Sequence, residues 1–285
     1  MDIDERSPQS LADVTGAPDV PPDAATEESA GFDPGFLGVP ATMPTMPDPQ
    51  AAASVELVYE HFTVMLDTTR RFAGVTGVNI DGARLVQVPR DDRWVFDDRV
   101  PEELQAGPEV YADNDLDRGH LVRRNDPVWG EPDEAARANT DTFSFTNAAP
   151  QASGFNQSRE LWLGLEDHVL EHARVNELKL SVFTGPVLAD DDPPYRGIRI
   201  PLRFWKVAVM VDSARQRLSA TAYLLDQTGM GASFDFVFGA FGTSQVPLSR
   251  LETLTGLDWG ALRSFDPLDA TGVATPLADL SAIRI

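Results

Sequence analysis

The sequence predicts an α+β domain in which helices flank a central antiparallel β-sheet. Segments rich in β-branched and aromatic residues, which are typical of strands, occur both early and late in the chain. One clear amphipathic helical pattern lies between these two groups, at residues 156–174. Strands that are grouped in this way around a helix indicate an α+β fold.

The first strands are predicted at residues 55–59 and 62–66. Residues 71–80 continue the same pattern of β-branched and aromatic residues up to the turn at 81–82. Because these segments are short and lie close together along the chain, we expect them to pair. A further short strand is predicted at residues 93–96, before the chain becomes polar.

The central helix is predicted over residues 156–174, where apolar residues recur at spacings of four. These residues are Leu161, Leu165, Val169 and Ala173. Residues 178–183 and 198–211 are predicted strands, and the second is long and apolar enough to lie centrally in the sheet. Residues 246–257 are predicted to form a short helix with a glycine as its stop signal.

Residues 1–50 are predicted to be a disordered, acidic and proline-rich tail, and residues 51–285 to be the folded domain. Arg6 is the one basic residue of the tail, which is rich in proline and carboxylates and buries too little apolar surface to offset its ordering entropy. Its one apolar cluster, residues 32–38, can dock on the domain.

The charge balance limits the kinds of nucleic-acid site that the chain can carry. Its 285 residues include 45 acidic and 23 basic ones, which gives a net charge of −22. A protein that holds nucleic acid by overall charge is basic, so a site for a polyanion must be local here. The sequence has no cysteine, and this excludes disulfides, cysteine-ligated zinc and thiol nucleophiles.

The sequence shows no sign of a membrane protein. It has no run of about 18 apolar residues and its start lacks the pattern of a secretory signal. We therefore expect no membrane partner, and either a cytoplasmic protein or one exported by a route that is independent of a signal peptide.

Several segments in a fixed order carry the candidate chemistry. They are DRGH at residues 117–120, FTNAAPQ at 145–151, FNQ at 155–157, TGP at 184–186 and IPLRFWKV at 200–207. This set resembles the DNA/RNA non-specific endonuclease family, the ββα-metal nucleases of the Serratia nuclease and mitochondrial endonuclease G type, and in particular its bacterial members. The resemblance covers about residues 54–260.

The resemblance implies a ββα-metal active site and Mg²⁺-dependent, sequence-non-specific hydrolysis of DNA, RNA or both, with Mn²⁺ as the alternative ion. His120 is the candidate general base, because a neutral imidazole can accept a proton from water. Asn156 is the candidate direct metal ligand through its amide oxygen, and few protein ligands would leave Mg²⁺ most of its waters. By resemblance, Glu166 holds one of those waters.

Five further residues complete the candidate site. By resemblance Arg93 contacts the substrate phosphate, and Arg118 is a second candidate for that contact and for catalysis, with a structural ion pair as its alternative. Asp117 is expected to orient the DRGH loop. Asn147 and Gln151 are expected to hydrogen-bond around the metal-binding loop and fix its orientation.

The choice of Glu166 over Glu160 depends on how the central helix begins. If the helix ran unbroken from Asn156, Glu160 would lie beside the metal ligand, because residues four apart share a face. We choose Glu166, since the spacing from Trp162 to Glu166 matches the family, and we expect the extra residues before Trp162 to form a looped or unwound first turn.

A homodimer is possible, and two other functions stay open. The first is a nuclease-fold protein with little activity, which would act by binding or assembly with the acidic tail as its interaction surface. The second is a zinc peptidase. Residues 168–172 read HVLEH, the HxxEH pattern of inverted zinc peptidases, whose two histidines share a metal. A helix rich in histidine and glutamate produces this string by chance, so the zinc peptidase is the remote alternative.

Overall fold

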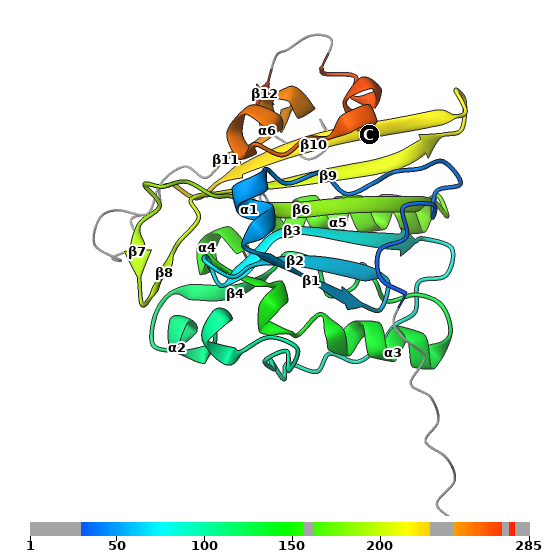
Figure 1. Ribbon diagram of the computed structural model, residues 1–285. Helices are drawn as coiled ribbons and strands as arrows, with labels where there is room; N and C mark the ends of the chain where they lie inside the picture. Colours follow the sequence, from blue (N-terminus) through cyan, green and yellow to red (C-terminus); the bar gives the residue numbers. More distant parts are fainter. Residues whose placement is uncertain (1–29, 157–161, 229–241, 270–273, 277–285) are drawn as a thin grey trace, which may run out of the picture.

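An antiparallel sheet forms the centre of the fold (Figure 1). The computed structural model of the chain describes residues 30–156, 162–228, 242–269 and 274–276. Within them, eight strands pair in the order β1-β2-β3-β6-β9-β10-β11-β12, each antiparallel to its neighbour. They are β1 (Ser54–Tyr59), β2 (Phe62–Asp67), β3 (Phe72–Asp81), β6 (Lys179–Val187), β9 (Arg203–Asp212), β10 (Arg217–Asp226), β11 (Gly242–Val246) and β12 (Thr275–Pro276). The predicted α+β fold with a central antiparallel sheet is therefore confirmed.

Smaller elements surround this sheet. Two short strand pairs are β4 (Leu116–His120) with β5 (Ala148–Ala152), and β7 (Pro194–Tyr195) with β8 (Ile198–Arg199). The α-helices are α1 (Asp48–Ala52), α2 (Pro108–Tyr111), α3 (Pro132–Asp141), α4 (Ser153–Asn156), α5 (Trp162–Val175) and α6 (Leu248–Thr255). The 3₁₀ helices are η1 (Glu102–Leu104), η2 (Phe145–Asn147) and η3 (Gly260–Phe265). Among the described helices, none has the length and apolar character that crossing a membrane requires.

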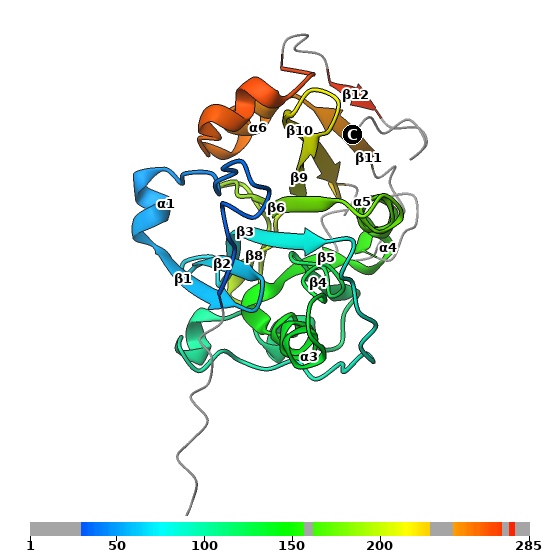
Figure 2. The ribbon, with the colours of Figure 1, turned by 90° about the vertical axis from the view of Figure 1, so that its right-hand side faces the viewer.

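The sheet separates two apolar cores. Because successive side chains of a strand point to opposite faces, Phe204 and Ala208 of β9 join the core that contains α5, whereas Trp205 and Val207 join the core that contains α6. Figure 2 shows α5 and α6 on different sides of the sheet. On β9 this alternation places Lys206 between Phe204 and Ala208, on the α5 side.

The early strands match the prediction, and two later predictions need correction. β1, β2 and β3 pair in sequence order, as expected. The strand predicted at residues 93–96 is only an isolated bridge between Val95 and Ser144, since Val95 alone exchanges backbone hydrogen bonds there. The strand predicted at 198–211 is divided into β8 and β9, because Pro201 lacks the amide hydrogen that a continuous central strand would donate.

The predicted central helix is described from Trp162 onward. Its described part is α5, from Trp162 to Val175, and the short α4 ends at Asn156. Residues 157–161, and with them Glu160, lie outside the described residues. The last helix, α6, begins after Pro247 and ends before Gly256, whose φ of 73° is a left-handed conformation that favours glycine.

Residues 30–50 pack against the domain, so the expected tail does not extend to residue 50. The Phe32 ring contacts Phe183 at 5.2 Å between centroids, and the Gly31 amide donates to the Tyr59 carbonyl. Phe36 lies near Trp129, with the Lys179 ammonium 4.5 Å from its ring centroid. The docked residues therefore include the apolar cluster at 32–38, and they supply enough apolar contact to order this stretch despite its composition.

Deleting residues 1–29 is expected to change the free energy of unfolding by less than about 0.5 kcal/mol, because this acidic, proline-rich composition forms few buried contacts. Phe32→Ala, by contrast, removes a half-buried ring from the sheet and should cost about 1–2 kcal/mol. Urea denaturation of both variants measures the difference. A truncation that costs as much as Phe32→Ala would show that residues 1–29 also belong to the folded unit.

Candidate active site

The DRGH motif forms strand β4 and pairs with the AAPQA segment of β5. In this register Gly119 lies opposite Ala149, and His120 lies opposite Ala148. A Cβ atom at Gly119 would overlap the side chain of Gln151, which is fully buried. Glycine is therefore required at this position so that the Gln151 side chain can pack across β4.

Gly119→Ala is expected to destabilise the protein by about 1–3 kcal/mol, because the added methyl group overpacks β4 against Gln151. Urea denaturation of the variant checks this value. The double variant Gly119→Ala/Gln151→Ala removes the overlapping side chain, so the cost of the glycine substitution should be smaller in that background. An equal cost in both backgrounds would rule out Gln151 as the cause.

A cavity of about 840 Å³ lies beside β4 and collects most of the predicted site. Five of the predicted residues line it: Asp117, Arg118, His120, Asn156 and Glu166. Three arginines that the sequence analysis does not assign to the site also line it: Arg90, Arg123 and Arg124. The cavity is thus locally basic in a chain whose net charge is −22.

His120 is held neutral by its surroundings. Its ring lies 4.7 Å from the Trp94 ring and nearly perpendicular to Phe143, at 5.2 Å between centroids. Burial lowers the pKa of His120 to about 3, and the positive charges of Arg90 and Arg124 add to this effect. The Nε2 atom is buried and has no hydrogen-bond partner among the described residues. The imidazole is therefore neutral at physiological pH.

Asn156 and Asp117 meet across the cavity. The Asn156 Nδ2 atom donates a hydrogen bond of 3.0 Å to Asp117 Oδ2. An amide group has a donor nitrogen and an acceptor oxygen, and a carboxylate can only accept. The bond therefore fixes the orientation of the Asn156 amide and leaves its Oδ1 atom free to accept or to bind metal. Asp117 therefore orients the side chain predicted to bind metal.

Glu166 is buried at the same cavity and is compensated by two cations. Its Oε1 atom lies 3.3 Å from Lys206 Nζ, and its Oε2 atom lies 3.8 Å from Arg123 Nε. Burial raises the pKa of Glu166 to about 7, although Lys206 and Arg123 favour the ionised form. Arg123 also pairs with Asp167 on the next position of α5. Glu166 thus ionises near neutral pH, inside the cavity.

Asn147, which is expected to hydrogen-bond around the metal-binding loop, hydrogen-bonds to the backbone beyond His120. Its Oδ1 atom accepts a hydrogen bond of 2.8 Å from the Val122 amide, and its Nδ2 atom donates to the carbonyls of Val122 and Thr142. These bonds fix the backbone that follows His120. The two polar atoms of the Gln151 side chain have no hydrogen-bond partner within the described part of the chain, so the amide network expected there is not seen.

Arg93 is not among the residues that line the cavity, and its contact with the substrate phosphate stays a prediction. Its side chain is 84% exposed and pairs with Asp91, two residues earlier, and this ion pair holds it at the surface. Arg118 does line the cavity, with its guanidinium carbon 5.4 Å from the centre of the Trp94 ring. Arg90, three residues before Arg93 in the sequence, lines the cavity.

Arg124 is positioned from α3, an element that the sequence analysis does not predict. Its Nη1 atom donates to Asn139 Oδ1 at 2.9 Å and to the Val88 carbonyl at 3.1 Å. Arg123 and Arg124 follow the DRGH motif closely in sequence, and this adjacency is the signal that could have assigned them to the site.

The HxxEH residues form no comparable centre. The rings of His168 and His172 lie 6.3 Å apart on α5, and the described residues place no third histidine or acidic ligand within reach of both. The zinc-peptidase alternative therefore gains no support from the structure.

Comparison with known proteins identifies the family. The sequence model of the DNA/RNA non-specific endonuclease family matches residues 40–263. The uncharacterized protein y4fB of Sinorhizobium fredii is 43% identical over 223 residues, 72% of this chain and 33% of that protein. Nuclease 1, mitochondrial, of Schizosaccharomyces pombe is 26% identical over 187 residues, 59% of this chain and 53% of that protein. The chain thus spans about a third and about half the length of these two relatives.

A solved structure supports the same assignment at the level of the fold. The crystal structure of a complex of EndoG with EndoGI matches with a TM-score of 0.53 and 23% sequence identity. The match covers 71% of this chain and 84% of that chain. Since the family model also spans most of the sequence, the predicted resemblance is confirmed, and the chain belongs to the DNA/RNA non-specific endonuclease family.

Proposed function

We propose that this chain is a Mg²⁺-dependent endonuclease that hydrolyses phosphodiester bonds of DNA, RNA or both without reading base sequence. One observation carries the proposal: a neutral imidazole, an oriented amide oxygen and a buried carboxylate share one arginine-lined cavity. Membership of the nuclease family supports it.

The donor set of the cavity fits a hard divalent cation. Asn156 Oδ1 would be the direct ligand, because Asp117 holds the other end of the amide. Lys206 and Arg123 contact the carboxylate oxygens of Glu166 and favour its ionised form. The ionised carboxylate would accept a hydrogen bond from a water bound to the ion. Mg²⁺ keeps several waters and binds through few protein oxygens, so such a sparse set suits it. When bound, the ion would stabilise the negative charge that develops on the phosphate and on the leaving oxygen.

His120 would accept the proton of the attacking water. Nδ1 would be the accepting atom, because Nε2 is buried. The water oxygen then forms a bond to phosphorus while the bond from phosphorus to the 3′ oxygen breaks. The leaving 3′ oxygen takes a proton from solvent water and His120 returns its proton to solvent, so the products carry a 5′-phosphate and a 3′-hydroxyl, as the family resemblance implies.

The arginines of the cavity would bind the substrate phosphates. Arg90, Arg118 and Arg124 present guanidinium groups, which pair with phosphate oxygens in a bidentate manner. They recognise the backbone of a nucleic acid and not its bases, which agrees with cleavage that is independent of sequence.

Plasmid DNA and structured RNA incubated with Mg²⁺ test the proposal directly, with EDTA-treated samples and casein as controls. We expect cleavage of nucleic acid that requires Mg²⁺, and no loss of casein. Binding of DNA without any cleavage would instead support the alternative of a nuclease-fold binding protein. Zinc-dependent cleavage of casein would instead support the zinc-peptidase alternative at the HxxEH residues.

A further inference from the structure

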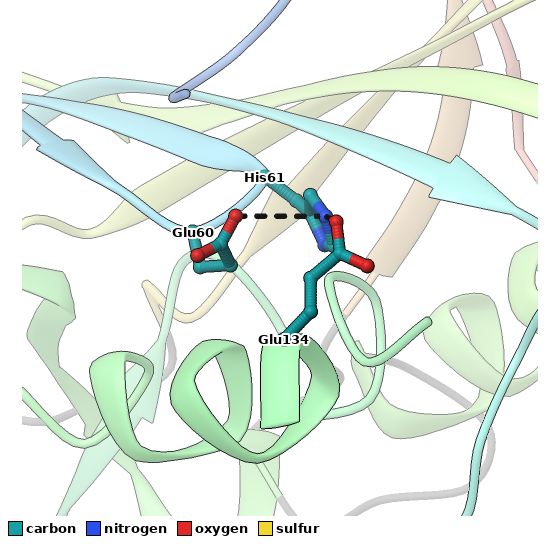
Figure 3. Close-up of side chains that lie close together, drawn as sticks. All are labelled: Glu60, His61 and Glu134. Carbon is teal, nitrogen blue, oxygen red and sulfur yellow. Dashed lines mark hydrogen bonds and ion pairs between the residues drawn. The ribbon is translucent and has the colours of Figure 1, made fainter. Parts of the chain in front are cut away.

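Three side chains outside the catalytic cavity converge where the turn between β1 and β2 meets α3 (Figure 3). Glu60 and His61 belong to the turn, and Glu134 belongs to α3. His61 Nε2 lies 2.9 Å from Glu134 Oε1 and 3.7 Å from Glu60 Oε1, and the three atoms all lie within 4.8 Å of one another. Glu60 and His61 are each 5% exposed.

Each carboxylate has one oxygen that is bound on its outer side and one that faces His61. Glu60 Oε2 accepts from Arg137 at 3.1 Å, and Glu134 Oε2 accepts from the Glu131 amide at 2.9 Å. Among the described residues, the ion-pair partner of Glu60 Oε1 is His61 Nε2 at 3.7 Å, and the Glu60 side chain is only 7% exposed. A largely buried carboxylate is costly unless positive charge lies beside it, and a cation between these atoms would supply that charge.

The ring of His61 points to a cation at the same place. Its Nδ1 atom lies 2.7 Å from the Pro127 carbonyl oxygen, which can only accept, so Nδ1 carries a hydrogen. A neutral imidazole has one N–H, so the lone pair of Nε2 then faces the Glu134 carboxylate at 2.9 Å. Two lone pairs at this distance repel each other unless a proton or a metal ion lies between them.

The position of His61 is fixed before any ion binds. Its backbone has a φ of 66°, and its ring stacks on Trp129 at 3.5 Å between centroids with an interplanar angle of 7°. Glu134 is held by its capping contact with Glu131 at the start of α3. The three inward atoms therefore form a prearranged group and do not depend on flexible side chains.

We propose that Glu60, His61 and Glu134 bind a divalent transition-metal ion of the Zn²⁺ type, separate from the catalytic ion. One imidazole nitrogen with two carboxylate oxygens suits such an ion better than Mg²⁺. Metal–ligand bonds of about 2.0–2.2 Å place ligand atoms roughly 3.0–3.6 Å apart. The observed separations of 2.9 and 3.7 Å lie just outside either end of that range, and the two carboxylate oxygens lie within 4.8 Å of each other.

Arg84 and Arg137 offset the negative charge at the two Oε2 atoms, and they do not lie between the Oε1 atoms and His61 Nε2. The Arg84 Nη2 atom lies 3.9 Å from Glu134 Oε2, and Arg137 contacts Glu60 Oε2. The ion would join the β1–β2 turn to α3, the helix that also holds Arg124 through Asn139. Its expected effect is therefore to stabilise the fold around the cavity.

Zinc titration by isothermal calorimetry tests the site in the full chain. The background is His120→Ala/Asn156→Ala, which removes the imidazole and the amide of the catalytic cavity. We expect one bound Zn²⁺, and at free zinc about 100 times the dissociation constant the folding equilibrium constant should rise about 100-fold. The rise in melting temperature on addition of zinc gives a second readout.

Glu60→Gln/Glu134→Gln should weaken zinc binding at least about tenfold and lower the thermal shift at the same zinc concentration to about half or less, because amides are poorer ligands than carboxylates. If the double variant does not fold, Glu134→Gln alone replaces it, since its amide oxygen can still accept from Glu131. His168→Ala/His172→Ala is the matched control and should leave zinc binding unchanged.

Absence of zinc binding in the background would overturn the proposal and would mean that only a proton lies between His61 and Glu134. Loss of binding in the His168→Ala/His172→Ala control, with binding retained in the glutamine variant, would place the zinc on α5 and would overturn it as well. Neither result depends on nuclease activity, so failure of this site and failure of the proposed function can be distinguished.

Discussion

His120→Ala is expected to lower the rate of plasmid cleavage by at least about 100-fold while the fold stays intact. The substitution removes the neutral imidazole that would accept the proton of the attacking water. It also empties a space beside Trp94 and Phe143, so added imidazole should restore part of the rate. Nicking of supercoiled plasmid, with and without imidazole, measures both effects.

His168→Ala and His172→Ala serve as controls for this experiment, because both histidines lie on α5 outside the catalytic cavity. Their cleavage rates should stay close to that of the unmodified protein. An unchanged rate for His120→Ala would exclude it as the general base. Loss of activity in either control, together with loss of bound zinc, would point to the HxxEH residues.

Glu166→Gln is expected to raise the Mg²⁺ concentration required for cleavage by about 10- to 100-fold. Glutamine keeps the shape of the side chain, but it removes the negative charge that Lys206 and Arg123 compensate. A Mg²⁺ titration of the initial cleavage rate gives the shift, and circular dichroism shows whether the fold is retained. Glu160→Gln is the matched control and should change little, and the reverse order would mean that the glutamate is wrongly assigned.

The pH dependence separates Glu166 from His120. The pKa of Glu166 is raised to about 7, so its charge appears as the pH rises through neutrality, whereas His120 is already neutral there. Activity at low Mg²⁺ should therefore rise with pH around 7. This rise should be lost in Glu166→Gln and should move to lower pH as Mg²⁺ increases, because the cation and the proton compete for the carboxylate.

The sequence predicts the elements whose pattern is local. The pairing of β1 with β2 follows from short runs of β-branched residues, and the end of α6 follows from Gly256. The motif positions of His120, Asn156 and Glu166 are equally local, and these three residues do share a cavity. A pattern of residue types along the chain is sufficient for predictions of this kind.

Features that depend on distant contacts could not be predicted. Arg93 and Arg90 have the same chemistry and each pairs with an aspartate two residues away, so only the folded structure shows that Arg90 lines the cavity. Lys206 is a charged residue within an apolar strand, and its partner Glu166 lies 40 residues away in sequence. Residues 30–50 have the composition of a disordered segment, and their order comes from the sheet that receives Phe32.

The two unequal faces of the central sheet determine how a duplex can approach. The side opposite α5 is covered by α6, η3 and apolar residues of the 32–46 segment, so the described chain offers its cavity on the α5 side. On the proposed mechanism, each chain would present one set of cleaving groups to one backbone of a double helix. A single chain would then need two binding events, in two orientations, to sever both backbones of a duplex.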